Sequence, residues 1–134
     1  MNKKKVYIDK SHQFATFEQS KRLIELGVIN TNPFYYIHKI GDRYDYCNWK
    51  VSFDTCVPTY TLIDILAALP EKIEYMNEEW ELSSDLERIG YQNCKLDNVR
   101  LYSEFVHKYD CITHAYAELL VSVYSDKEIK IKSR

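Results

Sequence analysis

The fold class is decided by residues 33–51, Pro33-Phe34-Tyr35-Tyr36-Ile37-His38-Lys39-Ile40-Gly41-Asp42-Arg43-Tyr44-Asp45-Tyr46-Cys47-Asn48-Trp49-Lys50-Val51. The first eight residues are rich in aromatic and β-branched side chains, which favour strands. Gly41-Asp42-Arg43 is a turn signal, and the residues after it alternate apolar with polar side chains. The stretch therefore predicts two antiparallel strands joined as a hairpin.

A helix is predicted before the hairpin. Thr16-Phe17-Glu18-Gln19 fits a capping box, in which Thr16 is the N-cap and Gln19 reaches back to it. We expect the helix to end at Gly27, because glycine adopts the left-handed conformation without a Cβ clash. Val28 can then fold back onto the last turn.

A second helix is predicted after the hairpin. Val57-Pro58-Thr59-Tyr60 should open it, with Thr59 or Thr61 as the cap, and Pro70 should stop it. The helical spacing is carried by Leu62, Ile65, Leu66 and Leu69. Because Ile63 and two alanines make the helix apolar on more than one side, we expect it to be well buried.

Strand patterns dominate the stretch from Glu71 to Phe105. Alternating or β-branched runs occur at residues 73–76, 80–82, 89–91 and 99–102, and Glu78-Glu79 and Leu96-Asp97-Asn98 are candidate turns. A last helix is expected from Cys111 to Tyr124, with Asp110 as its N-cap. In the tail, Ile129 and Ile131 alternate with lysines, which fits a short edge strand.

The order of these elements predicts an α+β fold. Strands cluster along the chain and no βαβ rhythm is sustained, which favours an antiparallel sheet of about four to six strands with about three helices packed mainly on one face. At 134 residues the chain suits a single domain, residues 1–134, with short charged tails at both ends.

Composition argues against several classes of partner. The formal net charge is −2 and the pI about 6.1, which favours neither nucleic acid nor an anionic membrane. No signal peptide is visible, and no apolar run approaches the roughly 20 residues of a membrane span. We therefore expect a cytoplasmic protein whose four cysteines are reduced, Cys47, Cys56, Cys94 and Cys111.

The sharpest candidate for metal chemistry is the trio His107, Cys111 and His114. On one continuous helix the i, i+4, i+7 spacing would place the three side chains on one face, where they could converge on zinc and leave an open position. However, Asp110 lies inside the trio, and as the expected N-cap it would place His107 before the helix. The favoured interpretation is a buried cysteine between surface histidines, with no metal and no cofactor.

No catalytic signature was found in the sequence. Nucleophilic serine motifs and phosphate-cradling glycine loops are absent, and the chain has only three glycines with which to build such a loop. The carboxylates Glu78, Glu79 and Glu81 are expected to form a solvated face, because neighbouring residues of a strand or turn point in different directions. We therefore expect a protein that is not an enzyme.

Tyrosine is the unusual component of this chain, which has 12 Tyr and 2 Trp. Such rings can line strands and helix margins, or they can form a surface for a protein partner. The aromatic residues in and just after the hairpin are too many for all of them to face one core. We take them as candidate partner-binding residues: Tyr35, Tyr36, Tyr44, Tyr46, Trp49 and Tyr60.

Two segments carry a resemblance to known proteins. Residues 15–27, Ala-Thr-Phe-Glu-Gln-Ser-Lys-Arg-Leu-Ile-Glu-Leu-Gly, are similar to an opening T-x-E-Q-A-K-x-L-x-E-L-G-F helix, and residues 57–64 resemble an A-P-T-Y-x-x-A-x-x-W-F helix start. These helices, and a final helix like that at residues 111–124, occur in small uncharacterised proteins of phages, prophages and mobile elements, common in gut Bacteroidetes. The chain departs from that pattern at Leu66 and Ala67. The resemblance implies a mobile-element accessory protein and supplies no catalytic residue.

The leading hypothesis is a non-enzymatic interaction protein that binds a host or phage protein through the aromatic surface. The first alternative is nucleic-acid binding by the hairpin aromatics and the basic termini, which the nearly balanced charge of the hairpin disfavours. The second is a small metal-assisted enzyme that uses His107, Cys111 and His114. A homodimer paired through a strand edge near the C-terminus is also open.

Overall fold

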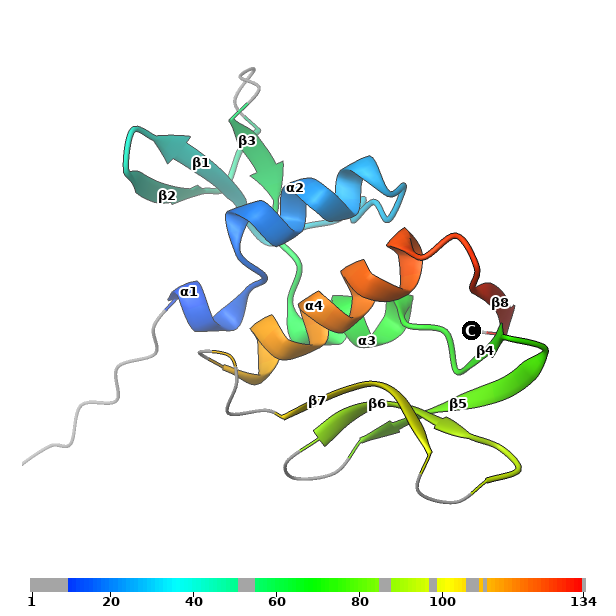
Figure 1. The fold of residues 1–134 in the computed structure, drawn as a ribbon. Helices are drawn as coiled ribbons and strands as arrows, with labels where there is room; N and C mark the ends of the chain where they lie inside the picture. Colours follow the sequence, from blue (N-terminus) through cyan, green and yellow to red (C-terminus); the bar gives the residue numbers. More distant parts are fainter. Residues whose placement is uncertain are drawn as a thin grey trace, which may run out of the picture.

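The computed structural model describes residues 10–50, 55–84, 88–96, 99–105, 109 and 111–133. Within these residues it has four helices and two antiparallel sheets (Figure 1), which confirms the α+β fold class. The helices are α1 (Lys10–Gln13), α2 (Phe17–Glu25), α3 (Leu62–Ala68) and α4 (Ile112–Ser125).

The strands divide between the two sheets. The smaller sheet has the order β2-β1-β3 and is built from β1 (Tyr36–Ile40), β2 (Arg43–Cys47) and β3 (Cys56–Pro58). The larger has the order β7-β6-β5-β4-β8 and is built from β4 (Lys72–Tyr75), β5 (Glu78–Ser84), β6 (Arg88–Asn93), β7 (Arg100–Phe105) and β8 (Lys130–Ser133).

The predicted hairpin is present as β1 and β2. Ile40 pairs with Arg43, so Gly41 and Asp42 form the two-residue loop, and Gly41 has a φ of 59°. The sheet also has a third strand, which the sequence did not predict. Cys56–Pro58 pairs with β1 as β3, whereas residues 57–60 were predicted to open a helix. That prediction was wrong because strand pairing with a distant segment leaves no local signal.

Helix α2 begins and ends as predicted. The backbone N–H of Gln19 donates to Thr16 Oγ1 at 3.1 Å, and the Thr16 N–H donates to Gln19 Oε1 at 3.0 Å, which completes the capping box. At the other end Gly27 has a φ of 84°, and the Val28 N–H donates to the Leu23 carbonyl at 2.9 Å. This is the Schellman arrangement, and it fixes the direction in which the chain leaves the helix.

Helix α3 is less buried than its sequence predicted. Thr61 caps it through a second capping box, with Asp64, and the helix ends before Pro70. Ile65 is fully buried, but Ile63 is 78% exposed and Leu66 is 42% exposed. The expectation that this helix is buried on more than one side was therefore wrong, since it packs against α4 with one face only.

The strands predicted between Glu71 and Phe105 are present as β4 to β7, and the expected C-terminal edge strand is β8. The turn was misplaced, because Glu78 and Glu79 begin β5. The chain instead turns at Met76 and Asn77, with φ values of 52° and 61°. Positive φ is rare for a methionine, so Met76 is not a typical turn residue, although Asn77 beside it is one. The other candidate turn includes Asp97 and Asn98, which lie outside the described residues.

Helix α4 is central to the core. It packs against α1, α2, α3 and strands β6 and β7, and in Figure 1 it lies with α3 on one face of the five-stranded sheet. Its first residue is Ile112 and its N-cap is Cys111. The predicted N-cap, Asp110, is one residue earlier and lies outside the described residues. None of the helices in the described part of the chain is long and apolar enough to cross a membrane.

Candidate functional site

A groove of about 320 Å³ opens between the β1–β2 hairpin and the helices that flank it. We call it the hairpin groove. The side chains that line it come from α1, α2, β1, β2 and α4, and they are Ser11, Thr16, Phe17, Glu18, Ile37, Tyr44, Tyr46 and His114. Aromatic and aliphatic groups make up most of its walls.

One wall of the groove is formed by β1 and β2, whose side chains alternate between the two faces of the sheet. Tyr44 and Tyr46 are two residues apart on β2, so both rings project from the same face, and Ile37 opposite Tyr46 joins them. Phe17 at the start of α2 forms the opposite wall. Its ring centroid lies 5.7 Å from that of Tyr44, and the two ring planes are tilted by 38°. Phe17 is buried with Ile37, whereas Tyr44 is 43% exposed. The groove therefore leads from the solvent down to the core.

The charges at the rim of the groove cancel. Lys39 Nζ lies 3.7 Å from Glu18 Oε1, and the same ammonium group lies 5.8 Å from the centroid of the Phe17 ring. Lys39 shares the face of Tyr44, its partner in register, so the pair lies at the edge of the apolar walls. A neutral, apolar group suits this site better than an anion or a cation.

His114 closes the inner end of the groove. It is only 6% exposed, and its Nε2 lies 2.6 Å from the Ser11 carbonyl oxygen and 3.0 Å from that of Phe14. Since carbonyl oxygens only accept, Nε2 must carry the proton and donate to both. The expectation that His114 lies at the surface was wrong, because its ring fastens the end of α1 to α4.

Cys111 also links α1 to the start of α4. Its Sγ donates to the His12 carbonyl oxygen at 3.5 Å, and the His12 ring meets that of His114 edge to face at 5.9 Å. Residues 111 and 114 of the proposed metal trio thus both bond to α1 or to the residue that follows it. His107 lies outside the described residues, among which no group of three His, Cys, Asp or Glu side chains could hold a metal ion.

The structure separates the six candidate partner-binding residues. Tyr44 and Tyr46 line the hairpin groove, whereas Tyr35 is not among the lining residues and contacts Phe14, at 5.8 Å between ring centroids. Tyr36 lies on the other face of β1, and Trp49, which is 67% exposed, lies beyond the end of β2. The aromatic residues therefore do not share one surface.

Tyr60 was wrongly assigned to the binding surface. It is 2% exposed, and its hydroxyl donates to the carbonyl oxygen of Val28. Burial raises the pKa of Tyr60, an effect that a hydrogen bond from the backbone of Asn30 partly offsets. Its ring packs in the larger hydrophobic core, so Tyr60 supports the fold and exposes almost no surface to a partner.

Several groove residues were not identified from the sequence as site residues. Phe17 and Ile37 matched ordinary helix and strand positions, and Ser11 lies in a segment without a clear signal. They meet Tyr44 only because the hairpin folds over the start of α2. A local sequence pattern does not predict a contact between separate helices and strands.

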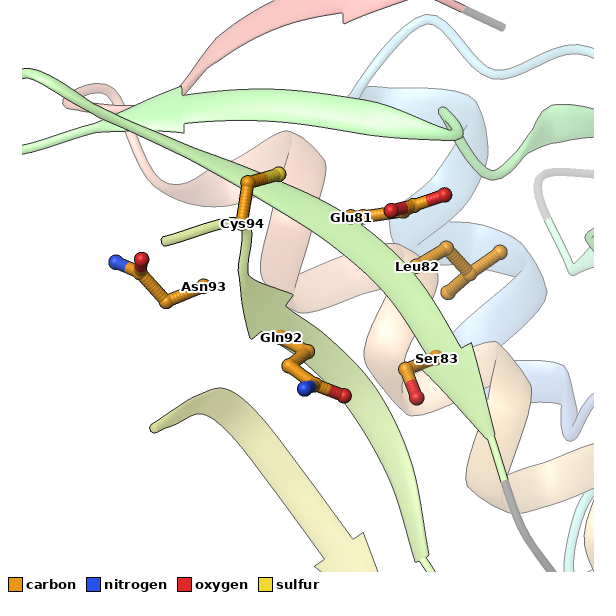
Figure 2. A pocket seen from close by; sticks show the side chains of 6 residues that line it. All are labelled: Glu81, Leu82, Ser83, Gln92, Asn93 and Cys94. Atoms are coloured by element: carbon orange, nitrogen blue, oxygen red, sulfur yellow. The ribbon is translucent and has the colours of Figure 1, made fainter. Parts of the chain in front are cut away.

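A second hollow, of about 350 Å³, lies on the five-stranded sheet. Figure 2 shows its lining on β5 and β6 and just after β6, namely Glu81, Leu82, Ser83, Gln92, Asn93 and Cys94. Its walls are mostly polar. The side chain of Asn93 is already hydrogen-bonded within the protein, since its Nδ2 donates to Glu78 Oε2 at 2.7 Å and its Oδ1 accepts from the N–H groups of the next turn. Glu78, Glu79 and Glu81 are exposed, which confirms the predicted solvated carboxylates.

Comparison with known proteins does not narrow the choice of function. No family model, no curated protein and no solved structure matches this chain. The resemblance of residues 15–27 and 57–64 to phage and mobile-element proteins therefore stays a prediction from those residues.

Proposed function

We propose that this protein is a binding module that takes an apolar side chain of a partner protein into the hairpin groove. The observation that carries the proposal is the exposed edge of Tyr44 over the buried ring of Phe17, which gives the groove an apolar wall reachable from solvent. Aromatic anchors in small pockets are typical of the residues that dominate protein–protein affinity. The groove, at about 320 Å³, is at the small end of ligand sites and suits one or two side chains.

The charge pattern favours a protein over a nucleic acid. Backbone phosphates are bound through uncompensated Lys and Arg side chains. Lys39, the cation beside the aromatic wall, already faces Glu18 at 3.7 Å. A neutral apolar side chain needs no such cation. The resemblance to mobile-element proteins favours a partner from the host or from the phage.

Selection from a library of random peptides displayed on a filamentous phage tests the proposal. The purified protein should enrich peptides that share one aromatic or large aliphatic residue. Tyr44→Ala should abolish their binding, whereas Trp49→Ala, which removes an exposed ring outside the groove, should leave it unchanged. Equal binding of the enriched peptides to both variants, or no enrichment at all, would count against the groove as the binding site.

A further inference from the structure

The β2 strand has an open edge as far as the described residues go, because it is the outermost strand of the three-stranded sheet. The hydrogen bonds of β1 show which groups lie there. Lys39 N–H donates to the Thr55 carbonyl at 3.0 Å, and the Thr59 N–H donates to the Tyr35 carbonyl at 2.9 Å. Odd-numbered residues of this segment thus bond toward β3, and even-numbered ones bond toward β2.

The direction of the Tyr44 backbone follows from this register. On β2 the partners of the even-numbered residues are Arg43, Asp45 and Cys47. Because bonding direction alternates along an antiparallel strand, the N–H and C=O of Tyr44 point away from β1, toward the open edge. Such an edge is a template for another strand.

Charge favours one register for self-pairing. Two identical antiparallel strands related by a two-fold axis pair with one residue on that axis. If Arg43 or Asp45 lay on the axis, it would face the same residue of the partner, which carries the same charge. If Tyr44 lay there, Arg43 would face the partner's Asp45 and Asp45 would face the partner's Arg43, while each Tyr44 would exchange two backbone hydrogen bonds with the partner's Tyr44.

We propose that two copies of the chain associate through their β2 edges in this Tyr44-centred register. The hairpin extends from the body of the molecule, away from the five-stranded sheet, which leaves its edge accessible (Figure 1). One short strand buries less than the roughly 1,000 Å² of a stable interface, so the dimer is weak and depends on concentration. The pairing does not depend on the proposed function.

The C-terminal edge, which the sequence suggested for self-association, is less suited. In β8, Lys130 and Lys132 flank Ile131. A two-fold axis at any of these three residues places a lysine opposite a lysine of the partner, and edge lysines are a common device against such pairing. The two edges therefore differ in charge pattern, with self-complementary charges on β2 and repulsive ones on β8.

Sedimentation velocity over a range of protein concentrations at low salt tests the proposal. We expect Arg43→Asp and Asp45→Arg each to weaken self-association by about tenfold or more, because each replaces two attractive contacts by repulsive ones. The double variant, which swaps the charges, should recover the wild-type value. An equimolar mixture of the two single variants should associate, since every facing pair in the mixed dimer has opposite charges.

The controls separate this inference from the proposed function. Lys132→Asp, at the other edge, should leave self-association unchanged. Arg43 and Asp45 project from the face of β2 opposite the groove, so their variants should keep the peptide binding proposed above. A wild-type protein that stays monomeric at millimolar concentration, or single variants that dimerise like the wild type, would overturn the inference.

Discussion

The ring of Tyr44 on β2 lies 5.7 Å from the ring of Phe17 on α2, and this contact joins the open surface of the hairpin groove to the core. Phe17 is fixed by its burial with Ile37 and Val57. An incoming side chain would therefore meet a wall that is already in place. Preorganisation of this kind reduces the ordering cost of binding.

The two rings should differ in their effect on stability. Phe17→Ala removes a buried side chain and should lower the free energy of unfolding by about 3 kcal/mol or more. Tyr44→Ala removes a ring that is 43% exposed and should cost about 1 kcal/mol. Urea unfolding followed by circular dichroism measures both. Equal costs would mean that Tyr44 belongs to the core and not to a binding surface.

His114 should prove essential to the position of α1. His114→Ala removes the Nε2 donor shared by the carbonyl oxygens of Ser11 and Phe14, the second of them in a buried bond, which should cost about 2–3 kcal/mol. His12→Ala loses one edge-to-face ring contact, and its cost should stay near 1 kcal/mol or below. Amide hydrogen exchange of residues 11–14 should speed up in the first variant. Similar stabilities for the two variants would refute this role of His114.

Gln19 should link α2 to α4 beyond its part in the capping box. Its Nε2 donates to the His114 carbonyl at 3.0 Å and to Glu118 Oε2 at 3.1 Å. Gln19→Glu keeps the acceptor that the capping box needs but replaces the donor by a negative charge, which should cost about 1–2 kcal/mol at neutral pH. Adding Glu118→Gln should restore much of that loss in urea unfolding. If the double variant is no more stable than Gln19→Glu, the contact between the helices is not what Gln19 contributes.

Stability should fall in alkaline solution. Burial, with a smaller effect of Tyr124, raises the pKa of Tyr91, whose hydroxyl donates to the Pro70 carbonyl at 2.6 Å. Burial also raises the pKa of Tyr60. In the unfolded chain a tyrosine loses its proton near pH 10, so above about pH 10 the folded state holds more protons and the free energy of unfolding decreases.

Urea unfolding at about pH 8 and at about pH 11 measures this loss, which should be smaller in Tyr91→Phe than in the wild type. The variant itself should be about 1 kcal/mol less stable at neutral pH, because the Pro70 carbonyl loses its donor. A wild-type stability that is unchanged between the two pH values would contradict the burial of both hydroxyl groups.

The features that could be predicted from the sequence are those set by neighbouring residues. Thr16 and Gln19 form their capping box within one helical turn, and Gly27 ends the helix through its own backbone conformation. The hairpin turn at Gly41 and Asp42 is equally local. Such signals depend on contacts between residues close in the chain, which a single sequence displays directly.

The features that could not be predicted depend on contacts between distant segments. The sequence around Tyr60 does not distinguish it from the exposed tyrosines, but its hydroxyl donates to the Val28 carbonyl on another loop. Val57 pairs with Ile37 as part of β3, although its neighbours fit a helix start. The hairpin groove is of the same kind, because Phe17, Tyr44 and His114 meet only through tertiary packing.

The most direct test of the central claim is an NMR titration of the ¹⁵N-labelled protein with p-cresol, the analogue of a tyrosine side chain. We predict that the largest changes in backbone amide shifts occur at Phe17, Ile37 and Tyr44, and that Tyr44→Ala reduces them while Trp49→Ala does not. No shift changes up to tens of millimolar p-cresol, or changes centred on the exposed face of α3 around Ile63, would contradict the assignment of the hairpin groove as the binding site.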